Sequence, residues 1–277
     1  MHTQLTPKDI IDNSKRIVIK IGTNSIIDVE QWFVKRDWLR KSIESYVDLK
    51  REFGIVSSGA IGMARVQMQG RAPTGLDERQ AFAAIGQPNL FDIYKSELAR
   101  CNLRAAQVLF TKHDLTTEPG LSTTQNTLAA LRRLETVYIA NENDSVANDE
   151  IKVGDNDNLG ALTAIADRAD TLILITDVNG LYTANPKTYS DAQHIQIVDT
   201  LTPEIMALGG GTNGDHGTGG MKTKLDAAFV AAAKGINTII VNGERPDCLT
   251  SLFNGDYSHA TFIPYTAYPQ SSLMFPL

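Results

Sequence analysis

The sequence predicts an α/β protein in which helices cover both faces of an open, mainly parallel β-sheet. Short apolar runs alternate with longer amphipathic segments along the chain. Strands separated by helices imply βαβ crossovers, and parallel sheets built in this way are buried on both faces. We see no internal repeat, low-complexity tract or linker, so we expect one domain over residues 1–277, formed of two lobes.

Apolar runs bounded by turn residues are the expected strands. Only Ile55 and Val56 are apolar before the segment SSGA, so the second strand is either short or extended by the end of the helical segment 34–53, and both alternatives remain open. The other runs are RIVIKIG (16–22), RAAQVLF (104–110), TVYIANEN (136–143), TLILITD (171–177), NTIIVNG (237–243) and ATFIP (260–264).

Four longer segments space their apolar residues at the helical period. The second contains Pro88, which predicts a break or a restart of that helix. The fourth is closed by Gly235. These segments cover residues 34–53, 76–100, 158–170 and 221–235.

The composition narrows the class of protein. Hydrophobic residues make up 42% and charged residues 21%, with a formal net charge of -6, so we expect no nucleic-acid partner. Cys101 and Cys248 lack the spacing of a disulfide framework or a zinc site. The polar N-terminus does not resemble a signal peptide, and no apolar run is long enough to span a membrane. We therefore expect a cytoplasmic protein.

Small or polar residues follow four of the expected strands. The segments are GTNS after Ile21, SSGAIG after Val56, NEND after the strand containing Ile139, and TDVNGLY after Ile175. Ligands bind outside the carboxyl ends of parallel strands, and helix N-termini suit phosphate or carboxylate groups. A substrate cleft at this edge is favoured over a set of ordinary turns.

Residues 141–158, NENDSVANDEIKVGDNDN, contain six carboxylates and five asparagines. A calcium loop starting at Asp155 fails, because Leu159 and Ala166 stand at its fifth and twelfth positions. A solvated acidic loop is the alternative. Asparagine supplies oriented donors and acceptors, which favours an acceptor substrate that carries both an ammonium group and carboxylates.

Residues 209–224, GGGTNGDHGTGGMKTK, form a glycine-rich stretch that leads into a helix. The dinucleotide-binding pattern occurs at Gly209, Gly211 and Gly214, but a helix-like segment precedes it where a strand is required. The Walker A pattern counted from Gly217 fails, because Lys222 stands where a glycine is required. A backbone cradle for phosphates and a plain surface loop both remain open.

Lys20 interrupts an otherwise apolar strand, so it lies either at a solvent-facing edge or against an anion in a cleft. Gly22 favours the cleft, because it allows close backbone approach.

Seven motifs, running in order across nearly the whole chain, resemble those of the amino acid kinase family. The pair NENDSVA and EIKVGDNDNL resembles the branch that phosphorylates glutamate, and separates it from the kinases of acetylglutamate, aspartate, carbamate and uridylate. The motifs are VIKIGTNS (18–25), VSSGAIG (56–62), AIGQ (84–87), NENDSVA (141–147), EIKVGDNDNLGAL (150–162), TDVNGLYTANP (176–186) and GTGGMKTKL (217–225).

This resemblance implies an eight-stranded, mainly parallel sheet between helices. It also implies transfer of the ATP γ-phosphoryl group to the γ-carboxylate of L-glutamate. The N-terminal lobe would bind glutamate and the C-terminal lobe ATP, with Mg²⁺ bridging the phosphates and no metal ligands assigned on the protein. Lys20 and Lys224 would flank the transferring group, and Asp157 would hold both lysines. Glutamate would contact Ser58, Asp144 and Asn156. The acidic stretch would then divide into NEND, which leaves a strand, and GDNDN, which opens a helix, with residues 147–153 as a lid or spacer between them. The nucleotide-binding positions would be Lys20, Thr176, Asp177, Thr218, Gly219, Gly220, Met221, Lys222, Thr223 and Lys224.

The resemblance leaves several further expectations. Members of the family are commonly dimers or tetramers, so we expect a homo-oligomer, and proline is an expected feedback inhibitor. Many members carry a C-terminal PUA-type RNA-modification domain, which we do not expect here. The alternatives are a kinase of the same fold with another small-molecule acceptor, and a catalytically silent amino-acid sensor. Retention of Lys20 and Lys224 argues against the sensor.

Overall fold

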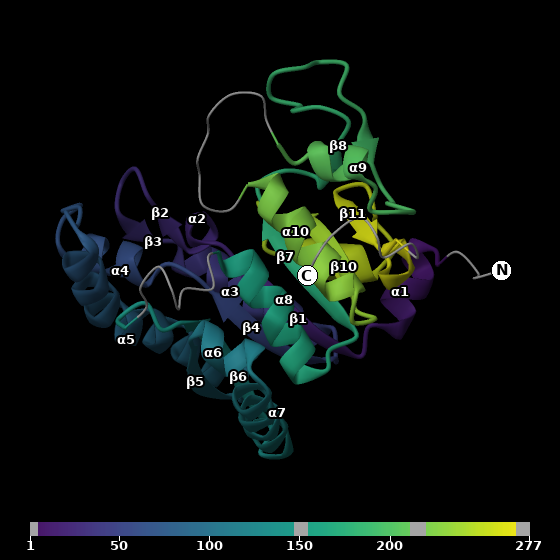
Figure 1. Cartoon of the computed structure of the whole chain (residues 1–277). Helices are drawn as coiled ribbons and strands as arrows, with labels where there is room; N and C mark the ends of the chain where they lie inside the picture. Colours follow the sequence, from purple (N-terminus) through teal and green to yellow (C-terminus); the bar gives the residue numbers. More distant parts are fainter. Residues whose placement is uncertain (1–4, 147–154, 211–219, 270–277) are drawn as a thin grey trace.

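The structure, a computed structural model, describes residues 5–146, 155–210 and 220–269. Its centre is a seven-stranded sheet in the order β11-β10-β7-β1-β4-β6-β5, with helices on both sides (Figure 1). Strand β11 runs antiparallel to β10, whereas the other neighbours pair in parallel. The strands are β1 (Arg16–Ile21), β4 (Glu52–Ser57), β5 (Arg104–Phe110), β6 (Thr136–Glu142), β7 (Thr171–Thr176), β10 (Asn237–Asn242) and β11 (Ala260–Ile263).

Two short antiparallel pairs lie outside this sheet. The first joins β2 (Ile27–Asp28) to β3 (Phe33–Val34), and the second joins β8 (Leu181–Tyr182) to β9 (His194–Ile195).

Each face of the sheet is covered by its own layer of helices and has its own hydrophobic core. The alternation of β1 divides its side chains between them, with Ile19 in the first core and Val18 in the second. The first layer comprises α1 (Pro7–Asn13), α2 (Thr23–Ile26), α3 (Arg36–Asp48), α4 (Ala60–Gln67), α5 (Leu76–Arg100) and α11 (Cys248–Phe253). The second comprises α6 (Lys112–Thr116), α7 (Glu118–Arg133), α8 (Asn156–Asp167), α9 (Pro203–Ala207), α10 (Met221–Ala232) and the 3₁₀ turn η1 (Tyr265–Ala267).

The α/β class and the parallel sheet are confirmed, but the implied count of eight strands is wrong for the described part of the chain. Seven strands form the sheet there. Beyond β11, Ile197 makes an isolated parallel bridge to Phe262, and the chain then turns toward α9. One bridged residue is too little to form an eighth strand.

The second strand is not shortened, because the end of the segment 34–53 contributes to it, which is one of the two alternatives that the sequence left open. Helix α3 ends at Asp48 instead of continuing to residue 53, and β4 pairs with β1 from Glu52 to Ser57 without a gap. Its polar start lies where the sheet meets solvent, and there Arg16 Nε donates to Glu52 Oε2 at 3.0 Å. Gly54 leaves the space that the Tyr138 ring occupies. The loop after β4 is therefore supported by a full-length strand.

Pro88 neither breaks nor restarts its helix, because α5 is continuous over 25 residues. Proline removes the hydrogen bond to the carbonyl four residues earlier, here that of Ala84. Both Pro88 and Ala84 face solvent, so water can hydrate that carbonyl group. The other helices occur close to where the periodicity predicts them, and Gly235 follows α10 with a φ of 78°.

No helix in the described part of the chain is both long and apolar enough to cross a membrane.

Candidate active site

The carboxyl ends of β1, β4, β6 and β7 meet at one edge of the sheet. The chain moves from β1 to β4 on one side and later returns to β7 on the other. This reversal makes the end of β1 a topological switch point, which is where ligands bind in open α/β sheets. Lys20 is the penultimate residue of β1. Only 6% of the residue is exposed, which excludes the solvent-facing edge.

One buried carboxylate holds two buried lysines at this edge. Lys20 Nζ lies 2.6 Å from Asp157 Oδ1, and Lys224 Nζ lies 3.1 Å from Asp157 Oδ2. The Thr223 hydroxyl donates to the same Oδ2 at 2.7 Å. Asp157 is completely buried. The cluster carries two positive charges against one negative charge, so it can attract a further anion.

Electrostatics keep Asp157 ionised. Burial alone would raise the pKa of its carboxyl group, but Lys20 and Lys224 outweigh burial and hold the pKa below its ordinary value. Burial lowers the pKa of Lys224, and Asp157 opposes this effect while the charge of Lys20 adds to it. The two ammonium groups account for the lowered pKa of Asp157, whereas burial accounts first for the lowered pKa of Lys224.

Local structure brings these groups together from three separate elements. Asp155 caps helix α8, because its Oδ1 accepts hydrogen bonds at 2.9 Å from the backbone N–H groups of Asp157 and Asn158. One turn further on, α8 packs against β1 at Gly160, where a Cβ would lie in ordinary contact with Lys20 Cβ at 3.4 Å. Helix α10 supplies Lys224 from its first turn, and it lies beside α8 (Figure 1).

Ser58 and Asn156 lie at the end of β4, next to this cluster. The Ser58 hydroxyl accepts from Thr23 Oγ1 at 3.1 Å and donates to the carbonyl of Ile21 at 3.3 Å. Asn156 Nδ2 donates to the carbonyl of Ser57 at 2.8 Å. The first residue of α8 is thereby tied to the strand that presents Ser58. Two of the three residues expected to bind the acceptor therefore lie at the same strand end.

Asp144 is half-buried in the turn that follows β6. The backbone N–H of Asn143 donates to the carbonyl of Phe110 at 2.8 Å, which ties this turn to the end of β5. The expected spacer between the NEND and GDNDN segments falls on residues 147–153, outside the described residues. The division of the acidic stretch into a strand end and a helix start agrees with β6 ending at Glu142 and α8 beginning at Asn156.

Apart from Lys20 on β1, the described residues expected to bind nucleotide lie at the carboxyl end of β7 and at the start of α10. Thr176 ends β7, and the exposed Asp177 pairs with Lys187 at 3.1 Å. Gly220 is the N-cap of α10, and Met221 is its first residue. Lys222 points away from Asp157, with its Nζ 2.8 Å from Asp226. Thr218 and Gly219 lie outside the described residues.

Three polar residues at this edge were not predicted as site residues. Thr23 contacts Ser58, as described above. Asn141 Oδ1 accepts from Asn156 Nδ2 at 3.1 Å, and Asn141 Nδ2 donates to Gln87 Oε1 at 2.8 Å. All three occur in motifs that the sequence displays. The signal that could have marked Gln87 is an amide group on an otherwise apolar helix face.

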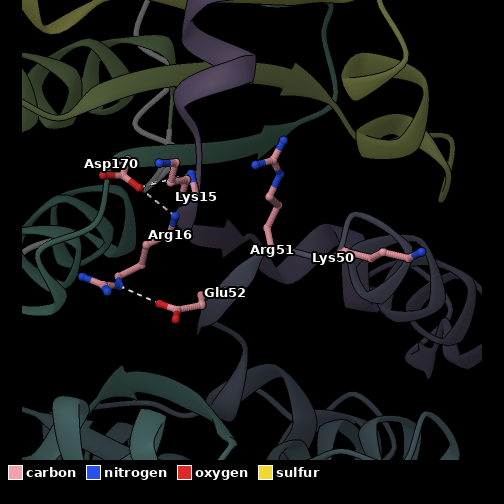
Figure 2. A pocket seen from close by; sticks show the side chains of 6 residues that line it. All are labelled: Lys15, Arg16, Lys50, Arg51, Glu52 and Asp170. Carbon is pink, nitrogen blue, oxygen red and sulfur yellow. Dashed lines mark hydrogen bonds and ion pairs between the residues drawn. The ribbon is translucent and has the colours of Figure 1, made fainter.

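A separate pocket of about 490 Å³ lies at the opposite edge of the sheet, where β1 and β4 begin. Figure 2 shows Arg16 paired with Glu52, while Lys50 and Arg51 point away from that pair. Lys15 and Lys50 are exposed to solvent. This pocket lies at the amino ends of the strands, away from the lysine cluster, so we exclude it from the candidate active site.

The fold and the lysine cluster at the switch point agree with one class of proteins, the amino acid kinases. A model of the amino acid kinase family matches residues 15–242, and the chain belongs to that family. Among its relatives, the "Glutamate 5-kinase" of Paraburkholderia phymatum is 39% identical over 271 residues, covering 94% of this chain and 71% of the relative. The "Glutamate 5-kinase" of Dehalococcoides mccartyi is 41% identical over 264 residues, covering 93% and 70%.

Solved structures of more distant relatives share the fold. A carbamate kinase from Giardia lamblia bound to AMP-PNP superposes with a TM-score of 0.63 at 16% identity, covering 91% of this chain and 99% of that one. An isopentenyl phosphate kinase from T. acidophilum, solved as a product complex, gives a TM-score of 0.61 at 15% identity, covering 90% and 99%. At this identity the likeness establishes the architecture alone.

Proposed function

We propose that the chain transfers the γ-phosphoryl group of ATP to the γ-carboxylate of L-glutamate, giving γ-glutamyl phosphate and ADP, the first step toward proline. The observation that carries the proposal is Asp157, which holds Lys20 and Lys224 between the acceptor-side residues and the start of α10. Relatives that carry the name glutamate 5-kinase at about 40% identity support glutamate as the acceptor.

The chemistry needs charge stabilisation and alignment more than it needs a base. A γ-carboxylate oxygen attacks the γ-phosphorus, the bond from that phosphorus to the β–γ bridging oxygen breaks, and ADP leaves with the electron pair. The ionised carboxylate has no proton to lose. The net positive cluster is suited to the negative charge of the transferring group, while Asp157 fixes both ammonium groups in place before the reaction.

The acceptor would be held by groups of complementary chemistry. The hydroxyl of Ser58 and the amide of Asn156 can form hydrogen bonds with carboxylate oxygens, and the Asp144 carboxylate can pair with the α-ammonium group. These residues come from the ends of β4 and β6 and the start of α8. On this proposal the acceptor would bind in the N-terminal lobe and ATP in the C-terminal lobe, and both substrates would meet at the lysine cluster.

Magnesium fits this site as an ion that arrives with ATP. Mg²⁺ prefers phosphate and water oxygens with few protein carboxylates. The described residues contain no group of three or more His, Cys, Asp or Glu side chains placed to hold a metal. When bound with ATP, the ion would neutralise part of the charge of the phosphates.

An acceptor panel tests this proposal. Purified protein with ATP and Mg²⁺ should release ADP with L-glutamate, but not with N-acetylglutamate, aspartate or uridylate. Equal or greater turnover with any of those three would favour a same-fold kinase with a different acceptor. Glutamate binding by calorimetry without turnover would favour the silent sensor.

The cytoplasmic location, the oligomeric state and inhibition by proline stay predictions. The measurement for the last is a proline titration at subsaturating glutamate, in which a flat response would reject feedback inhibition.

A further inference from the structure

Gln87 is an unusual residue for its position on α5. The buried face of this helix around it is apolar, with Phe82, Ala83 and Leu90 as neighbours along the helix. Gln87 is only 7% exposed. Its Oε1 accepts from Asn141, but within the described residues its buried Nε2 has no hydrogen-bond partner. Buried donors in native proteins are almost always paired, so this one requires an explanation.

A chain of amide groups connects Gln87 to the proposed acceptor site. Gln87 accepts from Asn141, Asn141 accepts from Asn156, and Asn156 also donates to the carbonyl of Ser57. Ser57 immediately precedes Ser58. The Gln87 side chain is therefore two hydrogen bonds away from one proposed acceptor residue and next to the strand end that presents the other.

Backbone packing fixes Gln87 against this strand end. The preceding Gly86 lies so close to the first turn of α4 that a Cβ would collide with the carbonyl oxygen of Ala60. Helix α4 begins directly after Ser58 and Gly59. Further along α5, the Tyr94 hydroxyl lies 3.0 Å from Ser57 Oγ. The position of Gln87 relative to the loop at Ser58 is thus set by rigid elements.

Lys20 and Gln87 are associated with the helix layers on opposite faces of the sheet. The Lys20 stem packs against Gly160 of α8, in the second helix layer, whereas Gln87 belongs to α5 in the first. The γ-carboxylate of glutamate must lie near Lys20 to receive the phosphoryl group. The α-carboxylate, at the other end of the same molecule, is then the group left to face the α5 side.

We propose that Gln87 is a specificity-determining residue of the acceptor site, whose Nε2 donates a hydrogen bond to the α-carboxylate of the bound amino acid. The inference rests on the proposed function. A neutral amide donor is suited to this task, because it binds a carboxylate without adding a positive charge that would compete with the lysines for the phosphoryl group. Its Oε1 meanwhile holds Asn141, and through it Asn156, in a fixed orientation.

The test is the substitution Gln87→Glu, which keeps an oxygen for Asn141 but replaces the Nε2 donor with a carboxylate oxygen. We expect the KM for L-glutamate to rise about tenfold or more, with kcat and the KM for ATP within about threefold of the unsubstituted protein. The matched control is Asn89→Asp, which makes the same charge change on the exposed side of the same helix. It should leave the KM for L-glutamate unchanged.

Gln87→Met provides a second variant without a new charge, and melting temperatures of all variants report folding. It too should raise the KM for L-glutamate by about tenfold. Lower melting temperatures with an unchanged KM for L-glutamate in both variants would mean a purely structural role and overturn the inference. Failure of the unsubstituted protein to phosphorylate L-glutamate would instead overturn the proposed function, so the two failures are distinguishable.

Discussion

Lys20 Nζ lies 2.6 Å from Oδ1 of Asp157, although the two residues come from different elements and both are buried. The lysine is the penultimate residue of core strand β1, and the aspartate is the second residue of helix α8. Lys224 occupies the other carboxylate oxygen. Because a buried carboxylate with two ammonium partners is fully ionised, the cluster keeps a net positive charge at the point where acceptor and nucleotide would meet.

Removing either lysine should slow the reaction strongly. We expect Lys20→Ala or Lys224→Ala to lower kcat by about 100-fold or more, because a preorganised charge stabiliser is lost. Steady-state kinetics with saturating ATP and L-glutamate measure this. Lys234→Ala is the control, since Lys234 is exposed after the end of the helix that carries Lys224. A change below about threefold in both test variants would remove these lysines from the reaction.

Asp157→Asn should reduce stability as well as turnover. The substitution leaves two buried ammonium groups without their counter-charge, which costs about 3 kcal/mol of unfolding free energy at neutral pH. The folded pKa of Asp157 is lowered, so its stabilisation exists above the unfolded value and is lost as the pH falls through the folded one. Denaturant unfolding at several pH values measures this. Asp226→Asn, at an exposed ion pair, is the control, and an equal loss in both variants would contradict the account.

The alkaline side of the pH profile should report Lys224. Burial lowers the pKa of this lysine below its ordinary value of 10.5. As the pH rises through that lowered pKa, the ammonium group loses its proton and the site loses a positive charge, so kcat/KM for ATP should fall. Lys224→Arg should move the fall to higher pH, because a guanidinium group stays charged. Circular dichroism at each pH separates this effect from unfolding, and identical profiles for both proteins would contradict the assignment.

Asp144→Ala should mainly affect the acceptor. Loss of the carboxylate that pairs with the α-ammonium group should raise the KM for L-glutamate about tenfold or more, while the KM for ATP stays the same. Asp12→Ala, at an exposed position of α1, serves as the control. If the KM for ATP rises instead, the assignment of the acceptor and nucleotide loops is reversed.

Gly86→Ala should disturb the contact between α4 and α5. The new methyl group would collide with the backbone of Ala60, and such overpacking costs about 3 kcal/mol. A lower melting temperature and a raised KM for L-glutamate are expected together, because the first turn of α4 follows Ser58. In Gly210→Ala the nearest atom, the oxygen of Ala207, would lie at 3.5 Å, so this control should be nearly neutral. A neutral Gly86→Ala would show that the contact is loose.

Much of the fold was predictable because apolar periodicity marks the strands and helices directly. The start of β4 stayed open, because Glu52 is polar yet pairs with β1, and a strand end at the sheet's rim tolerates polar side chains. The prediction failed at Pro88 because a proline on an exposed helix face costs one hydrogen bond that water can replace. Neither effect is visible in the periodicity.

The lysine cluster of the candidate site was predictable from the sequence, but the amide link from Gln87 was not. Lys20 was marked by its charge within an apolar strand, and Asp157 and Lys224 by the resemblance of their motifs. The link from Gln87 through Asn141 to Asn156 was not, because it joins residues up to 69 positions apart in the chain through side-chain hydrogen bonds. Such contacts depend on how α5, β6 and α8 pack, which local sequence does not specify.

The identity of the phosphorylated group tests the central claim most directly. Acyl phosphates react with hydroxylamine to give hydroxamates, whereas phosphate esters and free phosphate do not. In a reaction of the purified protein with ATP, Mg²⁺, L-glutamate and hydroxylamine, we predict γ-glutamyl hydroxamate in amounts equal to the ADP released. ADP release without hydroxamate, or a hydroxamate formed at the α-carboxylate, would contradict phosphoryl transfer to the γ-carboxylate.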